Sequence, residues 1–239
     1  MTRDREQLLR EMGLGPVWKL RVKPAAALPP AAAVAVPVPE PAAAVATAAP
    51  VAGMSWDELA AAVAACRQCR LCQARKQAVL GVGDRQADWL FVGEGPGAEE
   101  DQRGEPFVGQ AGKLLDNMLA AIGLKRGQDV YIANAVKCRP PENRTPTPEE
   151  TATCRPYLER QIELIQPRLI VALGRPAAQT LLQSDVKIAA ARGRLHDYRG
   201  IPLIVSYHPA YLLRTLLDKA KAWEDLCFMR RTMKTLKEG

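Results

Sequence analysis

The sequence contains no long hydrophobic run. None of its apolar segments reaches the ~18 residues that a membrane-spanning helix needs, and the residues that follow Met1 lack the apolar stretch of a secretory signal. We therefore expect a cytoplasmic protein with no membrane partner. Hydrophobic residues at 48% and charged residues at 25% are ordinary values for a folded domain, which excludes a wholly disordered chain.

The charge and the cysteines narrow the class of protein further. A net charge of +7 favours an acidic partner, and nucleic acid is the first candidate. Six cysteines in a chain expected to be cytoplasmic favour metal or redox chemistry over disulfides.

Composition divides the chain into three parts. Residues 24–53 contain 14 alanines and 7 prolines but only one charge, which predicts a disordered, semi-stiff linker. Residues 1–23 carry Leu8, Leu9 and Met12 at helical spacing. This short amphipathic segment either docks on a protein partner or packs on its own domain. The folded domain is expected at residues 54–239.

Strands alternate with helices along the folded domain. Four apolar runs predict strands, at residues 88–93, 130–136, 168–174 and 201–206. Such alternation is typical of a three-layer α/β/α fold with a central, mainly parallel four-stranded sheet. Ligands of such sheets bind beyond the carboxyl ends of the strands. A glycine-rich loop, Asn134 and His208 follow three of these strands, so we expect the site there.

Two pairs of cysteines from distant segments can supply four thiolates to one centre. The four are Cys66, Cys69, Cys138 and Cys154. Such a set suits a [4Fe–4S] cluster or, as an alternative, a structural zinc. Cys72 extends the first pair to C-x2-C-x2-C and is treated as a spare, and Cys227 is expected in the core. Isolated buried cysteines are the remaining alternative.

The loop Gly93-Glu94-Gly95-Pro96-Gly97 does not fit a dinucleotide fingerprint, because the third glycine that should open a helix is missing. The three carboxylates at residues 99–101 would also repel a pyrophosphate. The loop instead permits close approach of its backbone to a ligand.

Four strings together resemble the family 4 uracil-DNA glycosylases, the iron–sulfur members of the uracil-DNA glycosylase superfamily. The strings are Gly93-Glu94-Gly95-Pro96-Gly97, Glu105-Pro106-Phe107-Val108-Gly109, Asn134-Ala135-Val136-Lys137-Cys138-Arg139-Pro140-Pro141 and His208-Pro209-Ala210-Tyr211-Leu212-Leu213-Arg214. The resemblance begins near Ser55 and does not cover the first 53 residues. It implies a glycosylase fold, an iron–sulfur cluster and hydrolysis of deoxyuridine in DNA.

The resemblance assigns three side chains to the uracil ring. Phe107 stacks on the base, Asn134 reads O4 and N3–H, and His208 donates a hydrogen bond to O2 as charge develops there. Ordinary packing, a loop-capping amide and a histidine bonded within its turn are the respective alternatives. His196 is assigned no role.

The glycine-rich loop would line the sugar and the attacking water, through Gly93, Gly95, Pro96 and Gly97. Other branches of the superfamily carry an aspartate where Gly95 stands here. Glu94 is therefore the nearest candidate for positioning the water, with backbone carbonyl groups as the alternative.

Two groups of residues are expected at the DNA backbone and in the base stack. Leu212 and Leu213 can act as a wedge, with Arg214 on phosphate, although core packing of the leucines is an equal alternative. Lys137, Arg139 and Arg144 are expected to face phosphates, the alternative being a solvated basic face.

The predicted function is a monofunctional uracil-DNA glycosylase of base-excision repair. We expect a monomer that acts on single- or double-stranded DNA, with a cluster in a structural role. The alternative is a non-catalytic DNA-binding or polymerase-associated module of the same fold.

Overall fold

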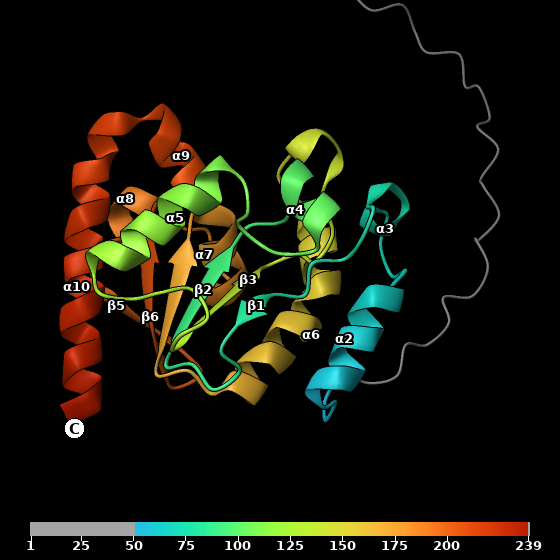
Figure 1. Ribbon diagram of the computed structural model, residues 1–239, viewed down its shortest axis with the longest axis horizontal. Coiled ribbons are helices and arrows are strands. Elements are labelled where there is room, and N and C mark those ends of the chain that lie inside the picture. Colours follow the sequence, from blue (N-terminus) through green and yellow to red (C-terminus); the bar gives the residue numbers. More distant parts are fainter. Residues whose placement is uncertain (1–50, 239) are drawn as a thin grey trace, which may run out of the picture. The chain divides into compact units, whose positions relative to one another are not determined.

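The computed structural model describes residues 51–238, which are coloured in Figure 1. The expected docking segment at residues 1–23 lies outside this range, as does the expected linker up to residue 50. No helix between residues 51 and 238 is both long and apolar enough to cross a membrane.

Six strands form one sheet in the order β1-β3-β2-β4-β6-β5. They are β1 (Val82–Gly83), β2 (Trp89–Gly93), β3 (Val130–Asn134), β4 (Leu169–Leu173), β5 (Leu195–Tyr198) and β6 (Ile201–Ser206). The four predicted strands β3, β2, β4 and β6 are adjacent and parallel, which confirms the predicted core of the sheet.

The sheet is wider than the predicted four strands, because β1 and β5 pair antiparallel at its two edges. The two residues of β1 are too few to give a periodic pattern. The β5 strand is mostly exposed and forms a hairpin with β6, so its sequence lacks the continuous apolar run of a central strand. Edge strands of this kind carry a weak sequence signal.

Helices cover both faces of the sheet (Figure 1). They are α2 (Trp56–Ala65), α3 (Leu71–Ala74), α4 (Ala98–Arg103), α5 (Gln110–Ala121), α6 (Pro148–Ile165), α7 (Arg175–Leu182), α8 (Ile188–Ala191), α9 (Pro209–Arg214) and α10 (Lys219–Glu238), with short 3-10 turns η1 (Pro141–Asn143) and η2 (Leu216–Asp218).

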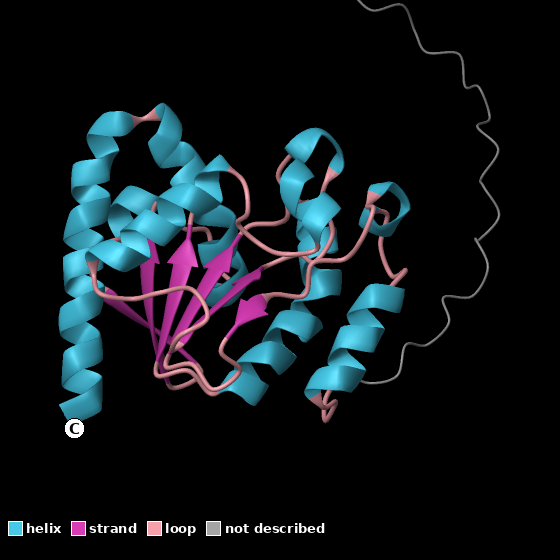
Figure 2. Cartoon of the chain, viewed as in Figure 1, coloured by secondary structure: helices cyan, strands magenta, loops and turns pink. Residues whose placement is uncertain are grey.

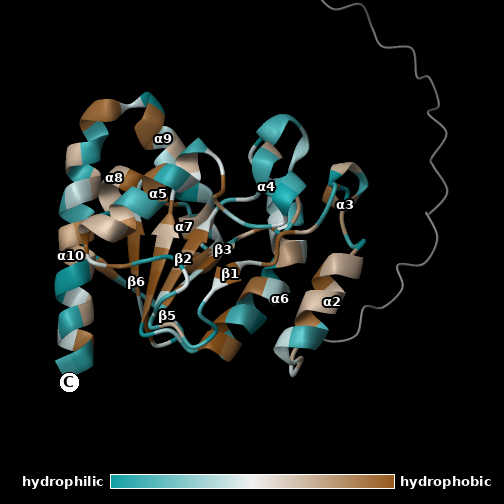
Figure 3. Cartoon of the chain, viewed as in Figure 1, coloured by the Kyte–Doolittle hydropathy of each residue, from teal (hydrophilic) through white to brown (hydrophobic). Residues whose placement is uncertain are grey.

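Alternate side chains of each strand enter two separate cores. On β2, Trp89 and Phe91 pack in one core with α5, α9 and α10, whereas Leu90 and Val92 pack in the other with α6 and α7. Figure 3 shows the resulting apolar sheet between helices whose outer faces are hydrophilic. The three-layer arrangement predicted from the sequence is therefore confirmed.

A third apolar cluster lies outside these layers, where α2 and α3 meet α6 (Figure 2). Ser55 caps the start of α2, because its hydroxyl accepts a hydrogen bond from the backbone N–H of Glu58 while the Glu58 carboxylate accepts one from Ser55 N. Leu59 and Val63 then bury their side chains against Tyr157 of α6. The cluster brings the first cysteine pair close to the second.

The order of the parallel strands reverses at β2. The chain passes from β2 outward to β3 and then returns across β2 to β4 on its other side. A crevice forms at such a reversal, beyond the carboxyl ends of the strands. The glycine-rich loop after β2 lies at this place.

Candidate active site

A cavity of about 710 Å³ opens at the carboxyl ends of the parallel strands. Its lining includes Glu94 after β2, Asn134 at the end of β3, Gly174 after β4 and His208 after β6. Pockets of roughly 300–1,000 Å³ are usual for small-molecule sites. Residues at the ends of the four predicted parallel strands therefore line one shared pocket. Phe107, from the loop before α5, lines the same pocket.

Asn134 presents an unpaired acceptor to this pocket. The side chain is 2% exposed, and its Oδ1 atom has no hydrogen-bond partner within residues 51–238. A buried amide oxygen without a partner is uncommon and costs free energy, unless a ligand supplies the missing donor. The backbone of Asn134 is fixed by its pairing with Gly93, so the amide has little freedom to turn away.

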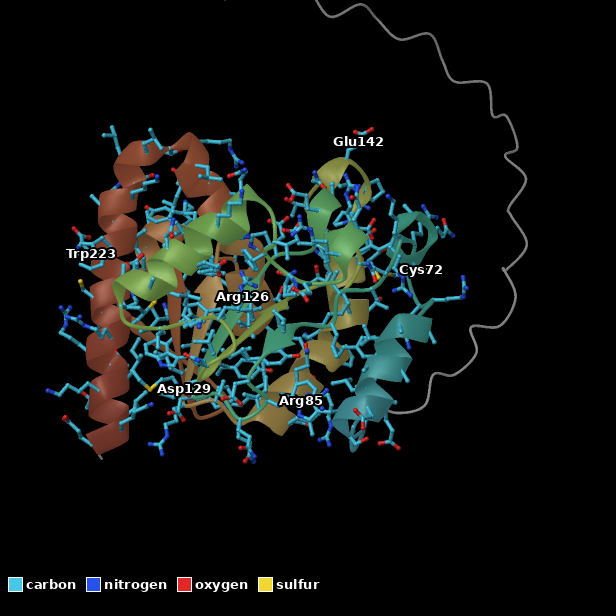
Figure 4. All side chains as sticks on the ribbon, viewed as in Figure 1. Cys72, Arg85, Arg126, Asp129, Glu142 and Trp223 are labelled. Carbon is cyan, nitrogen blue, oxygen red and sulfur yellow. The ribbon has the colours of Figure 1, made fainter. Side chains whose placement is uncertain are left out.

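Phe107 is held in a left-handed backbone conformation, with φ at 55°. Two flanking groups fix its loop. Arg126 donates to the carbonyl oxygens of Pro106 and Phe107 at 2.9 and 2.8 Å, and the Glu100 carboxylate accepts from Val108 N at 2.9 Å. Figure 4 shows Arg126 beside the sheet, below this loop. A strained conformation held by several bonds is typical of a functional position.

Gly93 allows Phe107 and Asn134 to approach each other. A Cβ atom at this position would lie 2.5 Å from Asn134 Oδ1 and 2.5 Å from Phe107 Cζ. Both distances are far below van der Waals contact, so only glycine leaves the ring and the amide in their present places. Gly93 thus sets the spacing between the Phe107 ring and the Asn134 amide.

His208 lines the pocket just after the end of β6. Its ring lies 5.4 Å from the Phe107 ring, centroid to centroid, with 29° between the planes. The residue caps α9, because its Nδ1 atom accepts a hydrogen bond of 3.2 Å from Ala210 N. Burial lowers the pKa of His208 to about 4, and the nearby Arg214 charge acts in the same direction. The neutral ring therefore carries its proton on Nε2.

Glu94 places a half-buried carboxyl group in the same pocket. Burial raises its pKa, while a hydrogen bond with Thr145 partly opposes that shift. A carboxylate removed from water in this way is a stronger base than an exposed one. The loop backbone at Glu94 is tied to β3, because Val136 N donates to Glu94 O at 3.1 Å.

The cationic residues predicted at the DNA backbone divide into different environments. Arg144 and Arg214 line the pocket. Arg144 is also paired with Glu150 through two bonds of 2.8 and 2.7 Å. Arg139 does not line the pocket and donates to Asn143 Oδ1 at 2.8 Å, beside Glu142 at the loop tip labelled in Figure 4.

Lys137 is a wrong prediction as a DNA contact, because its side chain is only 1% exposed. Its Nζ atom donates to Asn134 O at 2.8 Å and to Gln161 Oε1 at 2.5 Å. Burial lowers the pKa of Lys137 to about 8, and Cys154 and Cys138 would act in the opposite direction when they are ionised. The lysine belongs to the interior beside the strand end.

Leu212 is likewise wrong as a wedge into DNA, since it is 1% exposed and packs in the core beneath α5 and α10. Leu213 is exposed and keeps that role as a candidate. Beyond Arg214, η2 exposes Leu216 and Leu217 to 63% and 90%. Such large exposed apolar side chains next to the pocket lining were not singled out from the sequence.

The four predicted cysteines line one small cavity, and Cys72 lines it with them. Cys138 and Cys154 are buried in the third apolar cluster, against which Cys66 and Cys69 pack. All six cysteines of the chain are free thiols. Figure 4 places Cys72 at α3, on the side of the molecule that carries α2. The spare cysteine is therefore a neighbour of the set and is not remote from it.

Polar groups already surround the sulfur atoms. Arg75 donates to Cys138 Sγ at 2.8 Å and to the carbonyl oxygen of Cys66 at 3.0 Å, and Lys137 N donates to Cys154 Sγ at 3.2 Å. Burial raises the pKa of the Cys138 thiol, and it raises that of Cys154 to about 12.

These thiols stay protonated unless a cation replaces the proton, and the N–H donors would stabilise the resulting thiolates. The chemistry of this donor set fits an iron–sulfur cluster or zinc. Across residues 51–238, no group of three or more His, Cys, Asp or Glu side chains is arranged to hold a single metal ion.

The chain matches a known protein family. Residues 80–227 match the profile of the Uracil DNA glycosylase superfamily. The chain belongs to this superfamily. It is 47% identical over 167 residues to the type-4 uracil-DNA glycosylase of Archaeoglobus fulgidus, covering 66% of this chain and 83% of that protein. It is 49% identical over 151 residues to the type-4 enzyme of Thermotoga maritima, covering 62% and 78% respectively.

This superfamily member also resembles part of a larger protein. A DNA polymerase of Bacillus phage SP01 is 34% identical over 134 residues, which are 56% of this chain and 14% of that polymerase. The resemblance is confined to a small segment of the polymerase, so it indicates a shared domain.

Several residues that shape the pocket of this superfamily member were missed in the sequence. Glu100 joins two loops, because one carboxylate oxygen accepts from Gly97 N at 3.1 Å and the other from Val108 N at 2.9 Å. Asp101 is buried and accepts a hydrogen bond from Lys76 N at 2.9 Å. The only available signal was a run of three carboxylates beside two glycine loops, and that run does not reveal its partners.

Proposed function

We propose that this chain is a monofunctional uracil-DNA glycosylase of base-excision repair, which hydrolyses the bond between uracil N1 and deoxyribose C1′. The observation that supports it most is the meeting of Phe107, Asn134 and His208 around one cavity in a member of this superfamily. The pocket is a cavity beyond the carboxyl ends of the parallel strands, so the base must leave the DNA stack to enter it.

The roles of these three residues follow from their atoms. Phe107 offers a flat face to the extruded ring. Asn134 Oδ1, which lacks a partner among the described residues, accepts from N3–H of uracil, and the amide nitrogen donates to O4. Cytosine presents the opposite pattern of donor and acceptor and would leave these buried groups unpaired, so it is rejected.

Bond cleavage leaves the electron pair of the N1–C1′ bond on uracil. Negative charge then develops on O2, where the Nε2–H of neutral His208 donates a hydrogen bond. A donor directed at developing charge contributes about 3 kcal/mol to lowering a barrier. The attacking water forms the new bond at C1′, and Glu94 is our candidate for receiving its proton. No lysine is among the described residues that line the pocket, which agrees with simple hydrolysis.

DNA contacts are proposed for the exposed residues around the opening. Arg144 and Arg214 suit phosphates, and Arg139 lies earlier in the same loop as Arg144. Leu213, Leu216 and Leu217 are candidates for filling the gap left by the base. Either single- or double-stranded uracil-containing DNA could present the base in this way, and no second copy of the chain is required.

We propose that Cys66, Cys69, Cys138 and Cys154 hold a [4Fe–4S] cluster, with structural zinc as the alternative. When bound, the cluster would cross-link the end of α2 and the segment after it to the segment after β3 and to α6. Arg75 supports this arrangement by bonding both cysteine pairs. A brown preparation absorbing near ~400 nm would favour iron–sulfur ligation, and a colourless anaerobic preparation would favour zinc.

The test of the activity is release of free uracil. Oligonucleotides with one deoxyuridine, single-stranded or paired with guanine, are incubated with the cofactor-loaded protein, and uracil is measured directly before alkali cleavage of the abasic strand. Matched strands with thymine or cytosine at the same position are the controls. Release only from the uracil strands is expected.

A non-catalytic module is the second candidate, supported by the resemblance to a phage DNA polymerase segment. The same assay separates the two functions. DNA binding without any uracil release, from protein with its cofactor in place, would favour the module and contradict the glycosylase.

A further inference from the structure

Lys137 is a buried ammonium group with no carboxylate beside it among residues 51–238. Its side chain is 1% exposed, and no aspartate or glutamate among the described residues forms an ion pair with it. Its two acceptors, Asn134 O and Gln161 Oε1, are both neutral. A buried charge without a counter-charge is strongly unfavourable, so an anion is expected nearby.

The surroundings of Lys137 offer one kind of anion. The residue lines the cysteine cavity, its backbone N–H bonds Cys154 Sγ, and the next residue is Cys138. Iron or zinc held by four thiolates is a net anion, because the thiolate charge exceeds that of the metal core.

The neighbouring amide is oriented for the same purpose. Gln161 is fully buried, and its Nε2 atom donates to Leu80 O at 3.0 Å and to Tyr131 OH at 3.2 Å. Its Oε1 atom is thereby turned toward Lys137. The network fixes the position of the ammonium and contributes no charge to balance it.

The other bond of Lys137 reaches the base pocket. Its Nζ atom holds the carbonyl oxygen of Asn134, whose side chain carries the unpaired acceptor. One buried side chain therefore contacts the strand end that presents the base-reading amide, while its own backbone contacts a cluster cysteine.

We propose that Lys137 is the buried counter-cation of the thiolate-bound cluster, and that through its bond to Asn134 it makes the position of the base-reading amide depend on the cluster. Lys137 is thus a positioning residue for a reaction that needs no electron transfer. The inference rests on the proposed cofactor and function of the same chain.

The test is a cycle of mutation and cofactor removal. The midpoint of urea unfolding is measured with and without the cluster for the full-length protein, for Lys137→Met, and for Lys113→Met as a control at an exposed lysine of α5. In the parent, cofactor removal leaves the buried Lys137 ammonium without a counter-charge. Lys137→Met should therefore lose less stability on cofactor removal than the parent, and Lys113→Met should lose the same as the parent.

The loaded proteins give two further readouts. Lys137→Met should release iron to a chelator about 10–100-fold faster than the parent, the usual range for losing a group that supports metal ligands. Its cluster should also have a lower reduction potential, because a nearby positive charge has been removed. Equal stability losses, equal release rates and an unchanged potential would overturn the proposal.

A second variant keeps the test decisive if Lys137→Met does not fold. Gln161→Glu provides a carboxylate at the existing 2.5 Å contact, so the ammonium has a local partner when the cluster is absent. Cofactor removal should then cost less stability than in the parent, and an equal cost would contradict the proposal.

The dependence of Asn134 is tested by uracil release with and without the cluster. On cofactor removal, the parent should lose activity and selectivity against cytosine. Lys137→Met should have lower activity than the parent when loaded with its cluster, and this activity should change little when the cluster is removed. A parent that is loaded with its cluster but releases no uracil would overturn the glycosylase and leave the stability cycle valid. A parent that holds neither iron nor zinc would overturn the role of Lys137.

Discussion

The base pocket and the cysteine cavity differ in how their polar groups are paired. In the pocket, Asn134 Oδ1 has no partner, and the Nε2–H of His208 meets no acceptor within residues 51–238. Around the cysteines, the side chain of Arg75 and the backbone of Lys137 already bond the sulfur atoms. Unpaired groups cost stability and serve a ligand, whereas paired groups hold a structure.

This difference predicts that changes in the pocket reduce the rate and leave stability nearly intact, while changes around the cysteines act mainly on stability and less on the rate. Substitution of Lys137 should change both the rate and the stability, because this residue bonds Asn134 O and Cys154 Sγ. The experiments below test the two regions against each other.

The largest effect is expected for His208→Ala. Loss of the donor to O2 should lower the rate of uracil release about 100- to 1,000-fold, as for other removed donors to developing charge. DNA affinity should stay within about threefold, since the interaction strengthens only in the transition state. The matched control is His196→Ala, because His196 bonds Ala191 O, away from the pocket lining. A parent-like rate for His208→Ala would contradict this role.

Gly93→Ala should come next. The added methyl group would collide with Asn134 Oδ1 and the Phe107 ring, so one of them must move. Misplacement by about 1 Å can cost a hundredfold in rate. Single-turnover uracil release measures the effect. The control is Ala120→Gly, at an exposed position of α5. Gly123→Ala is a poorer control, because its Cβ would meet open space but an alanine would be strained at the backbone φ of 81°. Unchanged turnover would show that the amide and ring tolerate displacement.

Cys138→Ser should act mainly on stability. A serine at a buried thiolate position weakens the proposed cluster, and the free energy of unfolding should fall by roughly 2 kcal/mol or more. Uracil release by the remaining folded protein should fall by less than in His208→Ala. Cys227→Ser, outside the cavity lining, is the control and should keep the parent iron content. Equal iron content in the two variants would exclude Cys138 as a ligand.

The smallest effect is expected for pH. Since burial lowers the pKa of His208 to about 4, the ring stays neutral between pH 7 and pH 5, and its contribution to the rate should change less than twofold there. Unfolded protein binds a proton at this residue below about 6.5, so the histidine contributes stability above that pH, and this is lost as pH falls toward 4. NMR titration of the ring nitrogens checks the pKa, and protonation near 6.5 would contradict it.

The residues of the pocket could be predicted from the sequence for a physical reason. Parallel strands place their carboxyl ends at one edge of a sheet, so polar residues such as Asn134 and His208 directly after apolar runs had to converge. The four central strands were readable because both faces of each are buried. Phe107 stood out as one of three phenylalanines, in a glycine-flanked polar loop.

Burial of individual side chains was not readable in the same way. Lys137 follows a strand in a basic segment, and only the fold brings Gln161 of α6 beneath it. Leu212 and Leu213 are adjacent on one short helix, and the docking of α9 against α5 decides which of them enters the core. Such choices depend on tertiary contacts, which a local pattern of charge or hydropathy does not contain.

The central claim is that Phe107, Asn134 and His208 enclose an uracil base extruded from DNA. The most direct measurement is a crystal structure of the protein with an oligonucleotide that carries 2′-fluoro-2′-deoxyuridine, whose glycosidic bond resists cleavage. We predict the base in the cavity, stacked on Phe107, with N3–H and O4 at the Asn134 amide and O2 at His208 Nε2. A base bound elsewhere, or left in the DNA stack by a protein that releases uracil, would contradict the account.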